Sequence, residues 1–232
     1  MRKDRFFVPT DYVGESLVWR DQRLAHQLKN VLRLDDKREI YLFNGRGQEA
    51  TVKLIEIKAE NLKFQILAVG NLEESVNRVT LYASLLKKDN FELVVQKATE
   101  AGVAKIVPLI TERIVKQGGK ISRWRVIASE ASEQSGRLIV PEISEPLLFS
   151  EAVRLASDSH DSNIIFDSSG GKPKKASGDV GIFVGPEGGF EADEVALALA
   201  NGFSSVSLGE FTLRAETAAI IGTFVVAGGW HH

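Results

Sequence analysis

Two short apolar segments in the C-terminal part of the chain each run into a glycine-bearing loop and then into a helix-forming sequence. They are residues 184–190 (VGPEGGF) and 208–218 (LGEFTLRAETA). Loops at the carboxyl ends of parallel strands form the ligand-binding crevice of an α/β sheet. Glycine favours such a crevice because, without a Cβ, it lets backbone N–H and C=O groups contact a ligand directly. An ordinary strand–helix turn explains either segment alone, but the two together predict a binding crevice in an α/β domain.

Strand-like and helix-like segments alternate from residue 79 onward. We expect strands at 79–85, 106–110, 163–167, 180–184 and 205–208, and helices at 91–101, 122–134, 150–155, 191–200 and 215–227. This alternation is typical of a largely parallel α/β sheet. The Gly/Ser/Lys-rich residues 168–178 predict a mobile loop.

Residues 1–72 are mainly strand-like and predict a small, barrel-like β domain. Strands at 38–43 and 48–54 flank the sequence NGRG, a hairpin signal, and another strand is expected at 61–67. Apolar residues share one face of an expected helix at 24–32. Residues 45–50 match the pattern GxGxxA, but they join two strands instead of opening a helix, so we interpret them as a turn and not as a dinucleotide site. A polar hinge at 71–75 separates this domain from a second one over 73–232.

The composition excludes several kinds of site. The chain has no cysteine, so it offers no disulfide, thiol nucleophile or thiolate metal site. Apart from the terminal pair, its histidines are His26 and His160, which lie far apart in the sequence, so we expect neither a histidine-centred triad nor a metal site. The P-loop, HExxH and GxSxG motifs are absent. There is no apolar run long enough to span a membrane and no apolar signal core after Met1, so we expect a cytoplasmic protein without a membrane partner.

Charge is unevenly distributed, although the formal net charge is only −2. Lys and Arg outnumber Asp and Glu by 13 to 10 over residues 1–72 and by 11 to 6 over 78–137, whereas acidic residues prevail by 13 to 5 over 138–232. The first two blocks are able to present a cationic surface to a polyanion. Solvated charged faces without a partner explain the same excess, so the two interpretations stay open.

Several further motifs accompany the two glycine loops. They are residues 5–8 (RFFV), 31–34 (VLRL), 96–103 (QKATEAGV), 107–113 (VPLITER) and 133–137 (EQSGR). Together they resemble the RsmE family, the 16S ribosomal RNA uridine-N3 methyltransferases, within the SPOUT class of knotted methyltransferases. The resemblance runs along nearly the whole chain. It implies a PUA-like RNA-binding domain followed by a trefoil-knotted α/β domain, S-adenosylmethionine as methyl donor, 16S rRNA of the small ribosomal subunit as partner, and a homodimer with its active site at the subunit interface.

The resemblance also assigns a donor pocket to positions of this sequence. Leu208 and Leu213 would pack on the adenine faces, with core packing as the alternative for each. Backbone groups of the loops would satisfy the adenine edges. The expected donor-binding residues are Phe166, Val184, Gly185, Glu187, Gly188, Leu208, Gly209, Leu213, Arg214 and Ala218.

Methylation of uracil N3 requires loss of a proton and places negative charge on the base carbonyls. Arg214 is the expected catalytic residue for that charge, or else for holding the target phosphate, since a guanidinium is always charged. Glu216 is a candidate general base, but a water could serve, and Glu216 also suits the first turn of a helix. The family more often has Thr where this chain has Ala215, and we interpret the change as permissive.

Basic residues in both domains are candidates for phosphate contacts. Lys87 and Lys88 are the first choice, because they follow a strand end in the second domain; for each residue a solvated surface position is the alternative. The expected RNA-binding residues are Arg2, Arg5, Arg33, Lys87, Lys88, Arg113 and Arg137, with Lys3, Lys97, Arg123 and Arg125 as further candidates. A non-catalytic RNA-binding or assembly factor and a tRNA methyltransferase of the same class are the rival functions.

Overall fold

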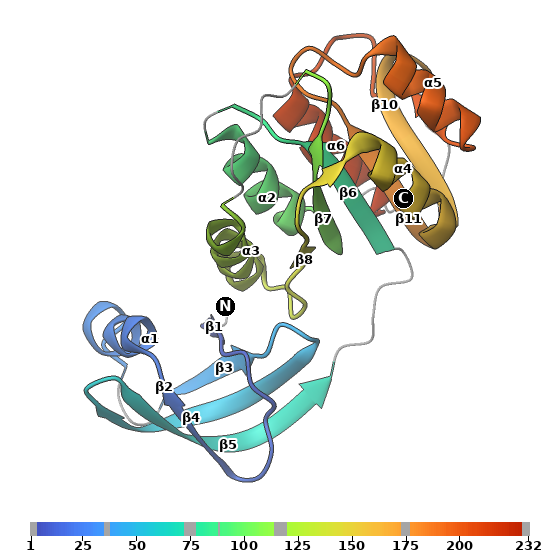
Figure 1. The fold of residues 1–232 in the computed structure, drawn as a ribbon. Helices are drawn as coiled ribbons and strands as arrows, with labels where there is room; N and C mark the ends of the chain where they lie inside the picture. The colour runs from blue at the N-terminus through green and yellow to red at the C-terminus, as the bar shows by residue number, and fades with distance from the viewer. Residues whose placement is uncertain are drawn as a thin grey trace. The chain divides into compact units, whose positions relative to one another are not determined.

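The computed structural model describes residues 4–34, 38–71, 78–87, 89–113, 120–172 and 177–228. The chain forms two compact units, each built on its own sheet (Figure 1). The first unit comprises residues 1–74 and 132–140, and the second comprises 75–131 and 141–232. The expected boundary after residue 72 lies close to this division. The sequence did not predict that residues 132–140 fold with the first unit.

Five strands form the mostly antiparallel sheet of the first unit, in the order β1-β3-β4-β5-β2, with β1 parallel to β3. Alternation along β3 and β4 buries Ile40, Leu42, Ala50 and Val52, which join Leu28 in one apolar core. The strands are β1 (Arg5–Phe7), β2 (Ser16–Arg20), β3 (Glu39–Phe43), β4 (Gln48–Lys58) and β5 (Asn61–Asn71).

The helix expected at residues 24–32 is present but is not a single α-helix. It consists of α1 (Gln22–His26), followed directly by a π-helical turn η1 (Gln27–Val31). The side chain of Asp21 caps its start by accepting a hydrogen bond from the N–H of Leu24 at 2.9 Å. Leu24 and Leu28 are buried, which explains the apolar face that predicted the helix.

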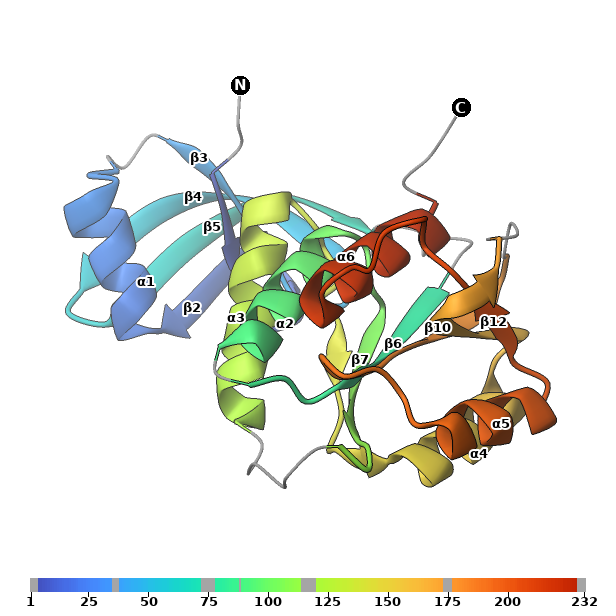
Figure 2. The same cartoon turned by 90° about the horizontal axis from the view of Figure 1, so that it is seen from above.

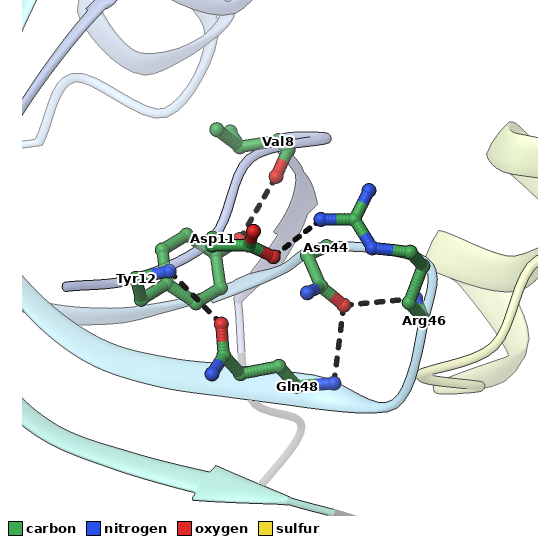
Figure 3. Close-up of polar contacts among 6 residues, drawn as sticks. All are labelled: Val8, Asp11, Tyr12, Asn44, Arg46 and Gln48. Atoms are coloured by element: carbon green, nitrogen blue, oxygen red, sulfur yellow. Dashed lines mark hydrogen bonds and ion pairs between the residues drawn. The ribbon is translucent and has the colours of Figure 1, made fainter.

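The turn between β3 and β4 confirms the hairpin interpretation of residues 44–47. Asn44 is buried, and its side-chain oxygen accepts hydrogen bonds from the N–H groups of Arg46 at 2.8 Å and Gln48 at 3.1 Å (Figure 3). The Gln48 side chain in turn accepts from the Tyr12 N–H at 2.9 Å, and Arg46 pairs with Asp11. The glycines at 45 and 47 adopt positive φ, which the turn requires, and no helix follows them.

Residues 132–140 complete the first unit through backbone and side-chain hydrogen bonds. The N–H of Gly47 donates to the carbonyl of Leu138 at 3.1 Å, and the N–H of Val140 donates to the carbonyl of Gly45 at 3.0 Å. Arg5 donates to the carbonyl of Gly136 at 3.0 Å. These partners lie far from β1 and β3 in sequence, so local patterns could not reveal them.

Seven parallel strands form the sheet of the second unit, in the order β12-β10-β11-β6-β7-β8, with β9 also pairing with β7. Helices α2 and α6 cover one face, and α4 and α5 cover the other (Figure 2). The parallel α/β class predicted from the alternation is therefore confirmed.

The strands are β6 (Arg78–Ser84), β7 (Lys105–Ile110), β8 (Glu142–Ile143), β9 (Leu147–Leu148), β10 (Ser162–Gly171), β11 (Asp179–Val184) and β12 (Ser204–Val206). The helices are α2 (Asn90–Glu100), α3 (Ile121–Ser135), α4 (Phe149–Ser159), α5 (Ala192–Ala200) and α6 (Ala215–Val226). None of the helices in the described ranges is long and apolar enough to cross a membrane.

Strand β10 extends further than the sequence predicts. Residues 168–171, expected to begin a mobile loop, belong to the strand, and residues 173–176 of that expected loop lie outside the described residues. Gly170 explains the extension, because the position of a Cβ there would lie only 2.5 Å from the backbone of Val206. Beyond it, the Gly171 carbonyl accepts the N–H of Ser207 at 2.8 Å. The prediction was wrong for these four residues because the irregular pairing of Phe166 and Gly171 with Val206 of β12 depends on a distant segment.

His160 follows α4 and reaches into the core of the second unit. Its Nε2 lies 2.9 Å from the hydroxyl of the buried Tyr82 on β6, the strand that pairs with both β11 and β7. Burial lowers the pKa of His160, Asp179 opposes that shift, and nearby Lys105 adds to it. Burial also raises the pKa of Tyr82 to about 12.

A histidine with a depressed pKa makes stability fall as the pH falls. Below its ordinary pKa of about 6.5 the unfolded chain binds the proton more readily than the folded one. We therefore expect the free energy of unfolding to decrease between about pH 7 and pH 5, and His160→Gln to flatten that decrease. Urea unfolding at several pH values measures this dependence. A free energy of unfolding that changes with pH equally in the variant and in wild type would contradict it.

Candidate active site

The loops after β11 and β12 and the middle of β10 enclose a cavity of about 260 Å³ at the carboxyl ends of β11 and β12. In an open parallel sheet this is the edge at which ligands bind. The cavity lies at the two glycine loops that the sequence singled out, and residues 166–168 of β10 add a third wall. The lining residues are Phe166, Asp167, Ser168, Val184, Gly185, Pro186, Glu187, Gly188, Gly189, Phe190, Val206, Ser207, Leu208, Phe211, Thr212, Leu213, Ala215 and Ala218.

The first glycine loop is a tight turn between β11 and α5. The N–H of Gly189 donates to the carbonyl of Pro186 at 2.9 Å, and Gly189 has a φ of +73°, which favours glycine. A Cβ at Gly185 would lie 3.1 Å from the backbone nitrogen of Phe190, so the loop folds closely over this residue. Glu187 at the tip accepts a hydrogen bond from the N–H of Lys87 at 3.3 Å, which ties the loop to the end of β6.

The second glycine loop connects β12 to α6. The hydroxyl of Ser207 donates to the carbonyl of Gly209 at 2.8 Å, and Gly209 has a φ of +155°. Phe211 is 84% exposed although it lines the cavity, so its ring stands at the rim. Helix α6 then begins with Arg214 as its N-cap residue, whose carbonyl accepts the N–H of Ala218 at 2.8 Å.

The charge and shape of the cavity suit a cationic nucleoside. Among its described lining residues, only Asp167 and Glu187 carry a formal charge, and both are negative. Phe166, Leu208 and Leu213 offer apolar surfaces, and the glycines expose backbone donors and acceptors. S-adenosylmethionine combines an aromatic base with a positively charged sulfonium, so the residues present fit this group.

Comparisons with known proteins decide the family. The model of the RNA methyltransferase domain matches residues 73–227, and that of the RNA methyltransferase PUA domain matches residues 21–67. The protein named ribosomal RNA small subunit methyltransferase E of Aquifex aeolicus is 36% identical over 89% of this chain and 92% of its own length. Its namesake in Rickettsia conorii is 34% identical over 84% of this chain and 83% of its own length. The chain belongs to the ribosomal RNA small subunit methyltransferase E family.

A solved structure of the same family shows the same fold. The crystal structure of the Neisseria gonorrhoeae enzyme bound to S-adenosyl methionine aligns with a TM-score of 0.88 and 30% identity, over 99% of this chain and 98% of that one. The resemblance to the RsmE family inferred from the sequence motifs is thereby confirmed, together with the PUA-like first domain and the α/β second domain.

The cavity brings together most of the residues that the family resemblance assigned to the donor. Gly209 and Arg214 do not line it, and both are exposed. The donor assignment from the sequence missed Asp167 and Phe211, although Asp167 directly follows the assigned Phe166 and Phe211 lies within the second glycine motif. The assigned residues that do line the cavity are Phe166, Val184, Gly185, Glu187, Gly188, Leu208, Leu213 and Ala218.

The two candidate catalytic residues have different environments. Arg214 is exposed at the start of α6, and in the described part of the chain its guanidinium has no hydrogen bond or ion pair. Glu216 is buried in the first turn of α6 and is not part of the cavity wall. A free guanidinium next to the lining residues Leu213 and Ala215 is available to a substrate, whereas Glu216 is placed where a carboxylate stabilises a helix N-terminus.

The candidate RNA-binding residues fall into three groups. Arg2, Lys3 and Lys88 lie outside the described residues. The side chains of Arg33 and Lys87 are exposed. The remaining candidates are engaged or shielded within the protein: Arg5 pairs with Glu49, Arg113 with Glu191, Lys97 with Glu100 and Arg123 with Glu92, Arg125 donates to the carbonyl of Ile143, and burial lowers the pKa of Arg137. Their contact with RNA stays a prediction, and the observed geometry gives Arg5 and Arg113 structural partners instead.

Gly222 of α6 packs against Phe166 in the cavity wall. A Cβ at this position would lie 2.5 Å from Cε2 and 2.9 Å from Cζ of Phe166. Alanine is the better helix former by about 1 kcal/mol, but overpacking a core costs about 1–3 kcal/mol. We therefore expect Gly222→Ala to lower the unfolding temperature, and Phe166→Leu in the same chain to restore part of the loss. Calorimetry checks both variants, and an increase in Tm for Gly222→Ala would contradict the packing argument.

Proposed function

We propose that this protein transfers a methyl group from S-adenosylmethionine to N3 of a uridine in 16S rRNA of the small ribosomal subunit, in the cytoplasm. The observation that carries the proposal is the cavity at the carboxyl ends of β11 and β12 in a chain of the RsmE family. Its walls are the two glycine loops and residues 166–168 of β10. Among the lining residues that the structure describes, only Asp167 and Glu187 are charged, and both are acidic.

The cavity residues bind and orient the donor. Bound there, S-adenosylmethionine supplies an electrophilic methyl group on a positively charged sulfur. Phe166, Leu208 and Leu213 would pack against the adenine faces, and backbone groups of the glycine loops would pair with its edges, since all of them line the cavity. Asp167 and Glu187 attract the positive charge. Orientation is the main contribution of the protein, because methyl transfer needs the nucleophile in line with the breaking bond.

Arg214 acts on the target nucleotide. As the N3–carbon bond forms, the sulfur–carbon bond breaks and the N3 proton leaves, so negative charge develops on the uracil carbonyls before it is quenched. A guanidinium that has no protein partner in the described chain stabilises that charge or fixes the adjacent phosphate. The proton goes to Glu216 or to a water; burial of Glu216 away from the cavity wall supports the water.

The functional form is a homodimer in this proposal, with the trefoil knot that the family resemblance implies. Ile221 and Phe224 on α6 are 38% and 44% exposed, on a helix composed almost entirely of apolar residues. An apolar helix normally buries all of its sides, so a second copy of the chain would cover this face. Light scattering at several protein concentrations measures the mass directly.

Donor binding and methylation together test the proposal. Isothermal titration with S-adenosylmethionine should show one site per chain. Small subunits from a strain that lacks the modification should accept labelled methyl groups, and mass spectrometry of digested nucleosides should identify 3-methyluridine. Purified tRNA and free 16S rRNA are the comparison substrates. Failure of the protein to bind the donor would favour an RNA-binding or assembly factor, and methylation of tRNA alone would favour the other rival function.

A further inference from the structure

Arg113 reaches from the end of β7 to the first glycine loop. Its Nε donates a hydrogen bond to Oε1 of Glu191, and its Nη1 donates to the carbonyl oxygen of Gly188. A Cβ at Gly188 would lie 3.0 Å from the same Nη1, which shows how closely the guanidinium covers this peptide. Gly188 lines the donor cavity, so Arg113 is one step removed from the ligand.

Glu194 makes a second connection between the same two segments. Its side chain is buried, and Oε1 accepts the N–H of Glu112 at 3.3 Å while Oε2 accepts the N–H of Glu191 at 2.8 Å. The backbone of Glu112 and the side chain of Arg113 therefore both bind the segment that joins the first glycine loop to α5: Glu112 through Glu194, and Arg113 through Glu191. A planar guanidinium with two differently directed donors restricts the orientation of the Gly188 peptide in a way that a single charge does not.

We propose that Arg113 is a positioning residue for the methyl donor: through Glu191 and the Gly188 carbonyl it holds the 185–189 loop in the shape that the donor requires. The inference rests on the proposed function of the cavity. It is an alternative to the expectation that Arg113 contacts RNA phosphate, because Nε and one of the two Nη1 hydrogens are already directed to protein partners.

The electrostatics of the pair are consistent with this role. The hydrogen bond to Glu191 raises the pKa of Arg113, and the guanidinium lowers the pKa of the Glu191 carboxyl below its usual value. Both groups stay charged at neutral pH. Their side chains are 42% and 37% exposed, so water and salt weaken the pair and its effect should be moderate.

Four variants separate a positioning role from an RNA contact. Arg113→Ala removes both donors, Arg113→Lys keeps the charge but loses the fork, and Glu191→Gln keeps an acceptor without the charge. Arg20→Ala is the matched control, because Arg20 forms a comparable exposed pair with Glu60, in which Nε donates to Oε1 at 2.6 Å, and neither residue lines the cavity. Each variant is titrated with S-adenosylmethionine, assayed for methyl transfer, and titrated with a 16S rRNA fragment at several salt concentrations.

We expect Arg113→Ala to raise the Kd and KM for the donor by about fivefold, as for a half-exposed pair, with kcat and RNA affinity unchanged. Arg113→Lys should lie between this variant and wild type, and Arg113→Ala/Glu191→Gln should be no worse than Arg113→Ala alone. Arg20→Ala should match wild type. Unchanged donor affinity, with weaker RNA binding and a salt slope reduced by about one, would overturn the inference in favour of a phosphate contact.

Hydrogen exchange without any ligand keeps the test independent of the proposed function. The Gly189 amide is protected by its bond to Pro186, and Arg113→Ala should speed its exchange while leaving amides in the first unit unchanged. If the wild-type protein binds no donor, the proposed function fails, and faster Gly189 exchange would still support Arg113 as the support of the loop. Unchanged exchange in a folded Arg113→Ala or Glu191→Gln variant would reject the inference.

Discussion

Replacing Arg214 with alanine is expected to lower the rate of methyl transfer by about 10²–10³-fold, as when a donor to a developing oxyanion is removed. Arg214 is exposed at the N-cap of α6, beside the cavity, and has no hydrogen bond or ion pair in the described part of the chain. Its removal should therefore leave the folded state almost unchanged. The measurement is single-turnover methylation of small subunits at saturating donor.

The controls for Arg214 separate catalysis from binding. Titration with S-adenosylmethionine should give a Kd within about twofold of wild type, because Arg214 does not line the cavity. Arg214→Lys should recover only part of the rate, since an ammonium lacks the planar fork of a guanidinium. A rate close to that of wild type in Arg214→Ala would remove Arg214 from the mechanism and direct attention to cations in the segments outside the described residues.

Replacing Gly185 with alanine is expected to weaken donor binding by about tenfold to hundredfold, the equivalent of overpacking a closely packed site. The added methyl group would lie 3.1 Å from the backbone nitrogen of Phe190 and 3.2 Å from the Gly189 carbonyl carbon. These are backbone atoms and cannot rotate away as a side chain can. The loop must shift, and it forms one wall of the cavity.

Two other glycines provide a graded comparison for Gly185. At Gly188 the nearest atoms belong to the flexible side chain of Arg113, so Gly188→Ala should have a smaller effect. At Gly70 in β5 no atom lies within 4 Å of the Cβ position, so Gly70→Ala should bind the donor as wild type does. Isothermal titration of the three variants checks this order. Equal affinities for Gly185→Ala and Gly70→Ala would show that the loop does not form the donor site.

The sequence predicts the cavity well because its main elements are local. Each glycine loop lies between a buried strand and a helix, and the carboxyl ends of parallel strands share one edge, so Val184, Gly188 and Leu213 could be brought together without knowledge of the fold. The hairpin at Asn44 was predictable for the same reason, since turn chemistry depends on a few adjacent residues.

The features that the sequence did not predict depend on partners far apart in the chain. Residues 132–140 join the first unit through hydrogen bonds to Gly45 and Gly47, and β10 continues to Gly171 because β12 lies beside it. Arg113 was interpreted as a surface cation because its partner Glu191 lies in a different strand–helix unit. Periodicity describes which face of an element is buried but does not identify the side chain that a surface cation meets.

Co-crystallisation with S-adenosylmethionine, supported by titration of the same preparation, decides whether the cavity is the donor site. Electron density for the donor is expected between Gly185–Gly188 and Leu208–Leu213, with the adenine against Leu208 and Leu213 and the methyl carbon facing the side of Arg214. Density for the donor at another surface, or an unchanged cavity at a donor concentration that saturates the titration, would contradict it.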